Sequence, residues 1–123
     1  MIVRYLAMQD NVQVEVTAWR SQLRKGTLEL AVLLLLKKER RYGLELVDLM
    51  NQANLGISEG SIYPLLSRLR AEKKVKTEWV DGEVGHAHKY YQLTDKGRAA
   101  CDAMSTAWRE YIGSFGRLVG AGK

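Results

Sequence analysis

Basic side chains are concentrated in two stretches of the 123-residue chain. Residues 20–41 contain seven basic and two acidic side chains, a local net charge of +5, and residues 58–76 contain five basic and two acidic ones, a local net charge of +3. The whole chain has a net charge of +5, so the remaining residues are slightly acidic. Basic surfaces of this kind attract polyanions. Either stretch on its own is also consistent with an ordinary solvated helix face.

The other reactive residue types form no recognisable catalytic or metal-binding set. We find no Ser/His/Asp arrangement, no Cys beside a base in a known motif, no paired carboxylates and no phosphate-binding loop. His86 and His88 form a His-x-His pair, but no further Cys, His or close acidic cluster completes a four-ligand zinc site. We therefore expect no enzymatic activity, no catalytic residues, no metal and no cofactor.

The composition predicts a single cytoplasmic domain. Hydrophobic residues make up 46% and charged residues 27% of the chain, as in soluble globular proteins, and 123 residues suit one hydrophobic core. The longest apolar run, at 30–36, is far shorter than the roughly 20 residues of a membrane span, and we identify no secretory signal. The single cysteine cannot form an internal disulfide, which favours a reducing compartment.

The basic stretches belong to predicted helices. Residues 21–38 have a helical pattern whose second half is apolar except for Glu29, which predicts a helix at the centre of the core. A second helix over 44–51 leads through a turn to a third helix over about 58–73, in which apolar residues recur at i, i+3, i+4 and i+7. Residues 1–20 combine a strand-like alternation of valines with an apolar helical turn, so we describe them as an N-terminal arm of uncertain structure.

The only proline of the chain, Pro64, bears on which residue is the N-cap of the third helix. With Ser58 as the N-cap, Pro64 lies beyond the first turn and should kink the helix, because proline lacks the required N–H. With Ser61 as the N-cap, Pro64 falls where no N–H partner is needed. We favour an irregular turn over 58–61 followed by regular helix. On either choice five hydrogen-bonding side chains lie away from the apolar stripe, namely Ser61, Tyr63, Ser67, Arg68 and Arg70.

A hairpin and a long helix complete the predicted elements. Strands over 75–80 and 89–93 flank an Asp-Gly turn at 81–85, and Thr94 has the character of an N-cap for a helix that ends at about Leu118. Apolar residues on this helix alternate in spacings of three and four, a heptad seam that must pack on its own domain or on another chain. We expect a dimer interface, with folding back on its own core as the alternative. The seam consists of Cys101, Met104, Trp108, Tyr111, Phe115 and Leu118.

Four separated motifs follow the order of these elements. They are Leu-Arg-Lys-Gly-Thr-Leu-Glu-Leu at 23–30, Tyr-Gly-Leu-Glu-Leu at 42–46, Gly-Ser-Ile-Tyr-Pro-Leu-Leu-Ser-Arg-Leu at 60–69 and Lys-Tyr-Tyr-Gln-Leu-Thr-Asp-Lys-Gly at 89–97. Together they resemble the PadR family of bacterial transcriptional regulators. The resemblance covers about 21–115, so the N-terminal arm lies outside it.

The resemblance implies a mainly α fold (α+β): a winged helix-turn-helix with a two-stranded β wing and a long C-terminal dimerisation helix. Its parts would be the arm at 1–20, the DNA-binding domain at 21–93 and the dimerisation helix and tail at 94–123. It also implies a homodimeric repressor whose third helix enters the major groove of double-stranded DNA at a palindromic operator. The alternative is a winged-helix protein-interaction module without DNA binding, against which the polar outer face of the third helix argues.

The resemblance further implies a set of DNA contacts. Arg on the third helix can contact a guanine edge through two hydrogen bonds. Lys25 and Lys89 would contact phosphates, which hold the register without reading sequence. Internal packing of Tyr63 and solvation of the two arginines are the alternatives. The expected DNA-binding residues of the third helix are Ser61, Tyr63, Ser67, Arg68 and Arg70.

Two further expectations concern the wing and an effector. Relatives often have arginines before Lys89, where this chain has His86 and His88, so phosphate attraction by the wing either weakens or grows at lower pH. Family effectors bind near the dimer interface. Trp108 is the candidate contact for a small aromatic effector, because indole stacks on planar rings, and plain interface packing is its alternative role.

Overall fold

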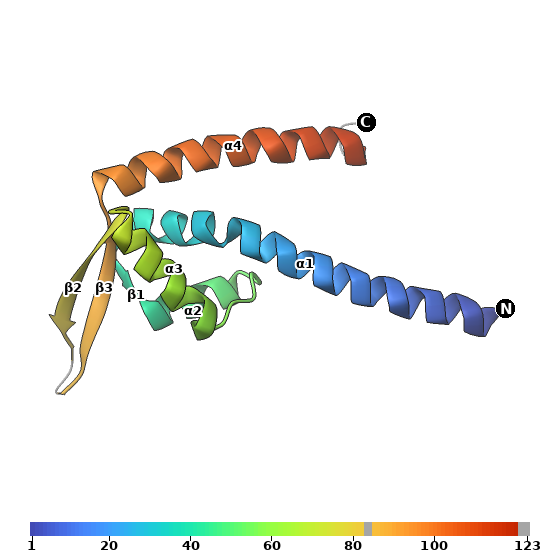
Figure 1. Ribbon diagram of the computed structural model, residues 1–123, viewed down its shortest axis with the longest axis horizontal. Helices are drawn as coiled ribbons and strands as arrows, with labels where there is room; N and C mark the ends of the chain where they lie inside the picture. Colours follow the sequence, from blue (N-terminus) through green and yellow to red (C-terminus); the bar gives the residue numbers. More distant parts are fainter. Residues whose placement is uncertain (83–84, 121–123) are drawn as a thin grey trace.

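The computed structural model describes residues 1–82 and 85–120 of the chain. Its elements are α1 (Ile2–Lys38), β1 (Arg41–Tyr42), α2 (Gly43–Gln52), α3 (Glu59–Ala71), β2 (Val75–Asp81), β3 (Ala87–Leu93) and α4 (Asp95–Val119). Figure 1 shows α2, α3 and the sheet as one body, from which α1 and α4 extend on the same side and diverge toward the two termini. This is the winged helix-turn-helix arrangement that the resemblance predicts.

The first helix, α1, is 37 residues long and includes the segment whose structure the sequence left open. The C-terminal part of α1 packs in the core, which stabilises the helix there. Residues 2–25 contain no glycine or proline that would end the helix, so it continues to Ile2. The alternating valines therefore lie on a helix. Large apolar side chains here are exposed, for example Tyr5 and Trp19, both at 59%. Within the described residues, no helix is both long and apolar enough to cross a membrane.

The core lies where α1, α2, α3, the sheet and the start of α4 meet. Ile62, Leu66 and Leu69 of α3 are fully buried, and burial of each such side chain stabilises the fold by about 2 kcal/mol. Because this stripe faces inward, the opposite side of α3 faces away from the body. The core residues are Val32, Leu33, Leu36, Leu46, Val47, Met50, Ile62, Leu65, Leu66, Leu69, Val75, Tyr91, Leu93 and Cys101.

Within the described residues the sheet has three antiparallel strands in the order β1-β3-β2. The β2–β3 hairpin is the predicted wing. Its predicted turn at 81–85 includes residues 83–84, which lie outside the described residues. Strand β1 was not predicted, because two residues are too few to show a strand pattern. Nε of Arg41 donates to the Leu35 carbonyl at 3.1 Å, which holds this short strand against the end of α1.

The third helix starts earlier than the favoured prediction. It begins at Glu59, directly after the N-cap Ser58, so the irregular turn expected over 58–61 is wrong. The Ser58 carbonyl accepts from the N–H of Ser61 at 3.1 Å and from the N–H of Ile62 at 3.2 Å, and the second bond is that of an α-helical turn. Pro64 lies inside the helix on its exposed side, where water can bond to the carbonyl that loses its N–H partner.

The last helix, α4, begins as predicted. The Thr94 hydroxyl oxygen accepts from the N–H of Gly97 at 3.0 Å, and the hydroxyl donates to the Lys73 carbonyl at 2.6 Å. This N-cap therefore also joins α4 to the turn after α3. The helix ends at Val119, and Gly120 follows with a left-handed φ of 89°.

Candidate functional site

The exposed side of α3 carries all five of its predicted hydrogen-bonding residues. They lie in two rows. Tyr63 and Arg70 border hollows that they share with the wing, whereas Ser61 and Arg68 lie beside α1. Ser67 lies between the rows, because helical periodicity places it near the middle of the exposed face. The face is therefore polar along its whole length, with a different structural neighbour on each flank.

A hollow of about 360 Å³ separates α3 from the wing. Ser67 and Arg70 line it from α3, and Lys89 and Tyr91 line it from β3. The ammonium of Lys89 lies 5.8 Å from the centroid of the Tyr91 ring. Tyr91 is itself buried, and burial raises the pKa of its hydroxyl, so its ring supports the sheet. The fold thus brings the predicted residues Ser67, Arg70 and Lys89 together, with a cation on each wall.

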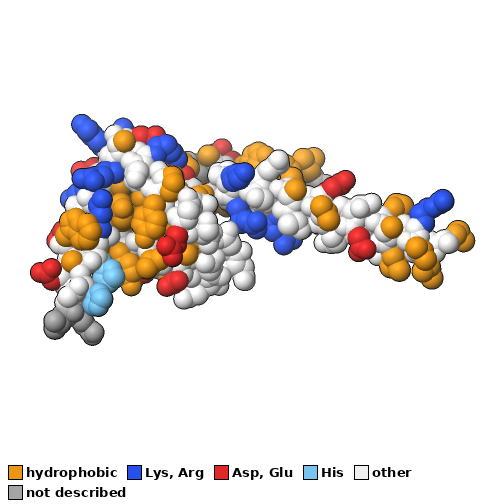
Figure 2. Space-filling view, turned by 60° about the horizontal axis from the view of Figure 1, so that its bottom comes forward, with side chains coloured by type: hydrophobic (Ala, Val, Ile, Leu, Met, Phe, Trp, Pro, Cys, Tyr) orange, Lys and Arg blue, Asp and Glu red, His pale blue; other side chains and the backbone are white. Residues whose placement is uncertain are grey.

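A second hollow, of about 370 Å³, lies between α1 and the turn that joins α2 to α3. Arg24 and Lys25 line it from α1, and Ser58 and Ser61 line it from the start of α3. Figure 2 shows Lys and Arg side chains gathered along the middle of α1. The free N–H groups of a helix N-terminus and two cations together favour a bound anion such as phosphate. Arg24 was not among the predicted contacts, although its place beside Lys25 in the basic stretch was a usable signal.

Tyr63 rests against the first turn of α2. Gly43 is buried there, and a Cβ at this position would lie 2.5 Å from Cε1 and 2.7 Å from the hydroxyl oxygen of Tyr63. The absence of a side chain on Gly43 therefore makes room for the Tyr63 ring, which remains 41% exposed. Gly43 was not predicted as part of the site, because only the tertiary fold brings it to Tyr63.

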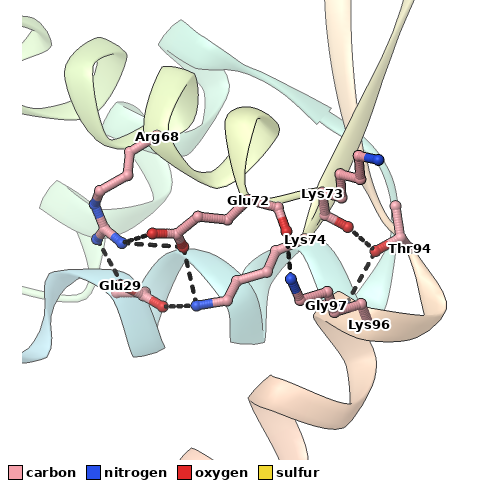
Figure 3. A network of polar contacts seen from close by, with 8 residues as sticks. All are labelled: Glu29, Arg68, Glu72, Lys73, Lys74, Thr94, Lys96 and Gly97. Atoms are coloured by element: carbon pink, nitrogen blue, oxygen red, sulfur yellow. Dashed lines mark hydrogen bonds and ion pairs between the residues drawn. The ribbon is translucent and has the colours of Figure 1, made fainter.

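Arg68 belongs to a network of four charged side chains that joins α1 to the end of α3 (Figure 3). Its Nη2 donates to Oε1 of Glu29 at 2.6 Å, and its Nη1 donates to Oε2 of Glu72 at 3.0 Å. Nζ of Lys74 lies 3.1 Å from the Glu29 carboxylate and 3.0 Å from that of Glu72. Positive and negative groups alternate around this network, so each charge has two opposite neighbours and the net charge is zero.

The network shifts the pKa values of its members. Burial of Glu29 opposes its ionisation, but hydrogen bonds from Arg68 and Lys74 outweigh burial and lower the pKa of Glu29 below its ordinary value. Hydrogen bonds from Lys74 and Arg68 also lower the pKa of Glu72. The same contacts raise the pKa values of Arg68 and Lys74. All four groups are therefore charged at neutral pH.

We expect the free energy of unfolding to decrease as the pH falls from about 5 to about 3. The pKa values of Glu29 and Glu72 are lowered by folding. Their stabilising contribution is complete above the ordinary glutamate pKa of about 4.3 and is lost as the pH falls through the folded-state values. Urea unfolding at about pH 7 and about pH 3.5 measures this change.

Two variants test whether the network causes this pH dependence. Glu29→Gln should lower the free energy of unfolding at neutral pH by about 1 kcal/mol and reduce its pH dependence. Glu110→Gln, which removes a carboxylate from α4 outside the network, should leave both unchanged. Equal pH dependence in Glu29→Gln and the wild type would contradict the assignment.

The wing histidines have different surroundings. The His88 ring stacks on Tyr42, with 4.2 Å between ring centroids and 16° between planes, and Tyr42 also meets Tyr90 edge to face at 5.5 Å. His88 therefore supports the junction of β1 and β3. His86 is exposed beside the hairpin turn. Within the described residues, no group of three or more His, Cys, Asp or Glu side chains is placed to hold a metal ion.

The predicted seam of α4 divides into an inner and an outer part. Cys101 is fully buried in its own core, where burial raises the pKa of its thiol, and Met104 packs half-buried beside it. These two side chains therefore pack within the chain. The outer four are exposed, with Trp108 at 41%, Tyr111 at 60%, Phe115 at 45% and Leu118 at 82%.

An apolar hollow of about 300 Å³ lies between α1 and α4 beside the outer seam. Trp108, Met104 and Tyr111 line it from α4, and Gly26 and Leu30 line it from α1. Its volume is at the lower end of the range for small-molecule sites, about 300–1,000 Å³. The predicted effector contact, Trp108, thus lies at a concave apolar surface.

Comparisons with known proteins agree on one family. A family model described as the transcriptional regulator PadR-like family matches residues 32–103. A PadR-like transcription factor from Bacteroides fragilis is 36% identical, with a TM-score of 0.68 over 82% of this chain and 98% of that one. A PadR family transcriptional regulator from Eggerthella lenta is 30% identical, with a TM-score of 0.75 over 94% and 97%. Bacillus subtilis PadR, solved in complex with operator DNA, shares the fold at 23% identity and a TM-score of 0.60, over 63% of this chain and 45% of that one.

Proposed function

The chain belongs to the PadR-like family of transcriptional regulators, and we propose that it acts in the cytoplasm as a sequence-specific DNA-binding repressor. In this proposal two copies form a homodimer on a palindromic operator. Residues 21–93 of each copy contact double-stranded DNA, residues 94–123 join the two copies, and a small aromatic effector weakens DNA binding. Residues 1–20 extend α1 beyond the DNA-binding part.

The observation that carries the proposal is a polar α3 face with cations on both flanks. Arg24 and Lys25 lie on the α1 side, and Arg70 and Lys89 lie on the wing side. The major groove is about 12 Å wide, admits one α-helix and is bordered by phosphates on both sides. A helix with cations on each flank is suited to this shape. A surface for docking another protein would have a more apolar centre.

The proposed contacts are of two kinds. Side chains on the exposed face of α3 would contact base edges and the groove, where an arginine can recognise guanine. Lys25 and Lys89 would contact phosphates and fix the position of α3. We add Arg24 to the proposed phosphate contacts, because it lines the same hollow as Lys25. The proposed α3 contacts are Ser61, Tyr63, Ser67, Arg68 and Arg70.

The proposed dimer uses the outer seam of α4. Soluble monomers rarely expose a continuous row of large apolar side chains. The rings of Tyr111 and Phe115 contact edge to face with 4.9 Å between centroids, so they form one surface next to Trp108. Exposed apolar side chains of α1, such as Val12 and Trp19, extend the surface that a second copy could cover.

The proposed effector site is the hollow between α1 and α4. A planar aromatic compound could stack on the Trp108 indole there and would find mostly apolar walls. The same helix, α1, lines the hollow that contains Lys25 and Ser61. A ligand that shifts α1 would therefore move a proposed phosphate contact relative to α3.

We expect Arg68→Ala and Lys89→Ala to weaken DNA binding in different ways. Loss of Arg68 should relax the preference at one base position by about tenfold. Loss of Lys89 should weaken binding to all sequences alike and reduce the slope of log K against log salt by about one unit. Selection from a randomised DNA library, followed by titrations at two salt concentrations, measures both effects. A uniform loss of affinity in both variants would show that Arg68 does not read bases.

We expect Gly43→Ala to reduce operator affinity about tenfold, equivalent to about 1.4 kcal/mol, with little loss of stability. The new methyl group would overlap the Tyr63 ring and displace it. The cost to folding is small because the ring ends a flexible, partly exposed side chain. Fluorescence anisotropy and thermal unfolding measure the two quantities. If the effect persists in a Tyr63→Ala background, it does not act through Tyr63.

A further inference from the structure

Glu29 is an acidic residue in the most apolar part of α1, and both of its carboxylate oxygens accept hydrogen bonds. Oε1 accepts from Nη2 of Arg68 at 2.6 Å, and Oε2 accepts from Nζ of Lys74 at 3.1 Å. Its side chain is only 18% exposed. Burial of a carboxylate is costly unless opposite charges compensate it. The place of Glu29 therefore depends on these two contacts.

Arg68 is held by two carboxylates but remains partly exposed. Its two terminal nitrogens donate to Glu29 and Glu72, while its side chain remains 49% exposed. Within the described residues Nε has no hydrogen-bond partner. A guanidinium carries five N–H donors in a rigid plane, so fixing its two terminal nitrogens also fixes the direction of the remaining donors. An arginine without these contacts would lose rotamer freedom when it binds DNA, which costs free energy.

We propose that Glu29 is a positioning residue for base recognition, which orients the Arg68 guanidinium so that its remaining N–H donors face the major groove. This inference rests on the proposed function, because it requires α3 to enter DNA. Glu29 itself would not touch DNA. Glu72 is the C-cap residue of α3, the helix that carries Arg68, so of the two carboxylates Glu29 is the one that ties the guanidinium to another element, α1.

The chemistry of Glu29 suggests a variant that separates positioning from plain stabilisation. Both of its oxygens face donors, whereas the amide of Glu29→Gln has a single acceptor, so its NH2 group must face either Arg68 or Lys74. Lys74→Met in the same chain removes one of these donors and lets the amide oxygen turn to Arg68. The double variant should therefore recover the orientation of Arg68, although it loses further charged contacts.

Selection of binding sites from a randomised DNA library tests the proposal. Arg68→Ala first identifies the base pair that depends on Arg68. Glu29→Gln should relax the preference at this base pair by about fivefold or more, with the other positions unchanged. Glu29→Gln/Lys74→Met should regain most of the preference. Glu59→Gln removes a carboxylate from the first turn of α3 outside the network and should change affinity for all sequences alike.

A shorter acid provides a second variant in case Glu29→Gln fails to fold. Glu29→Asp keeps the charge but lacks one methylene group, so it should relax preference at the same base pair. Thermal unfolding shows which variants are folded at the assay temperature.

Three outcomes would overturn the inference. If folded Glu29→Gln or Glu29→Asp keeps the wild-type preference at this base pair, the inference is overturned and the proposed function stays intact. If Arg68→Ala selects the same sequences as the wild type, the inference is also overturned, because Arg68 then reads no base. A wild-type protein that selects no sequence from the library would overturn the proposed function and this inference together.

Discussion

A variant with Trp108→Ala and Phe115→Ala is expected to sediment as a monomer at micromolar concentration, whereas the wild type is expected to sediment as a dimer. The two side chains are 41% and 45% exposed in the single chain, and in the proposed dimer the second copy buries them. Each truncation of a buried aromatic residue costs about 3 kcal/mol or more. Both copies of the dimer carry both substitutions, so dimerisation should weaken by at least about four orders of magnitude.

Two controls belong to this experiment. Thr106→Ala/Arg109→Ala changes the opposite face of α4 and should leave the dimer intact. Thermal unfolding should show that both double variants still fold, because neither pair belongs to the core. An intact dimer in the Trp108→Ala/Phe115→Ala variant would mean that the interface lies elsewhere on the molecule.

The second large effect is expected for Gly97→Ala, which should lower the free energy of unfolding by about 3 kcal/mol or more. Gly97 is buried in the first turn of α4, where a Cβ would lie 2.0 Å from the Lys74 carbonyl oxygen and 3.1 Å from Cδ2 of Leu93. The carbonyl belongs to the backbone of the turn after α3, so it cannot move without shifting α4 or α3. The melting temperature should fall by about 10 °C or more.

A second glycine of α4 provides the matched control for Gly97→Ala. A Cβ on Gly113 would meet only Nη1 of Arg117 at 3.9 Å, an ordinary contact. Gly113→Ala should therefore stabilise the protein by about 0.5–1 kcal/mol, because alanine loses less backbone entropy than glycine in a helix. If Gly97→Ala unfolds at the wild-type temperature, α4 does not approach the turn after α3 as closely as the structure shows.

Local patterns predicted the elements whose determinants lie in neighbouring residues. The apolar stripe of α3 fixed which side is buried, so the exposed position of Tyr63, Ser67 and Arg70 followed from spacing alone. The Thr94 N-cap was also visible locally, because its partner Gly97 is three residues away. By contrast, β1 forms only through pairing with β3, far along the chain, and two residues carry no pattern of their own.

The site residues that the sequence did not predict have one feature in common, which is that their contacts form only in the folded chain. Gly43 and Tyr63 are 20 positions apart, and the contact between them exists only after α2 and α3 pack together. Arg24 belongs to the site only because the turn between α2 and α3 lies beside it in the folded chain. Glu29 offered a signal, since it interrupts an otherwise apolar run. A buried acid in such a run indicates a cationic partner, but the sequence could not show that this partner is Arg68.

Sequence-specific DNA binding through α3 can be measured as the affinity for a DNA fragment from the protein's own promoter region. Fluorescence anisotropy should compare this fragment with a scrambled one of equal length and composition at two salt concentrations. We expect a preference of about 1,000-fold or more for the promoter fragment, and affinity for both fragments that falls with salt. Equal affinity for the two fragments would contradict sequence-specific recognition, and no binding to either would favour a winged-helix module that binds another protein.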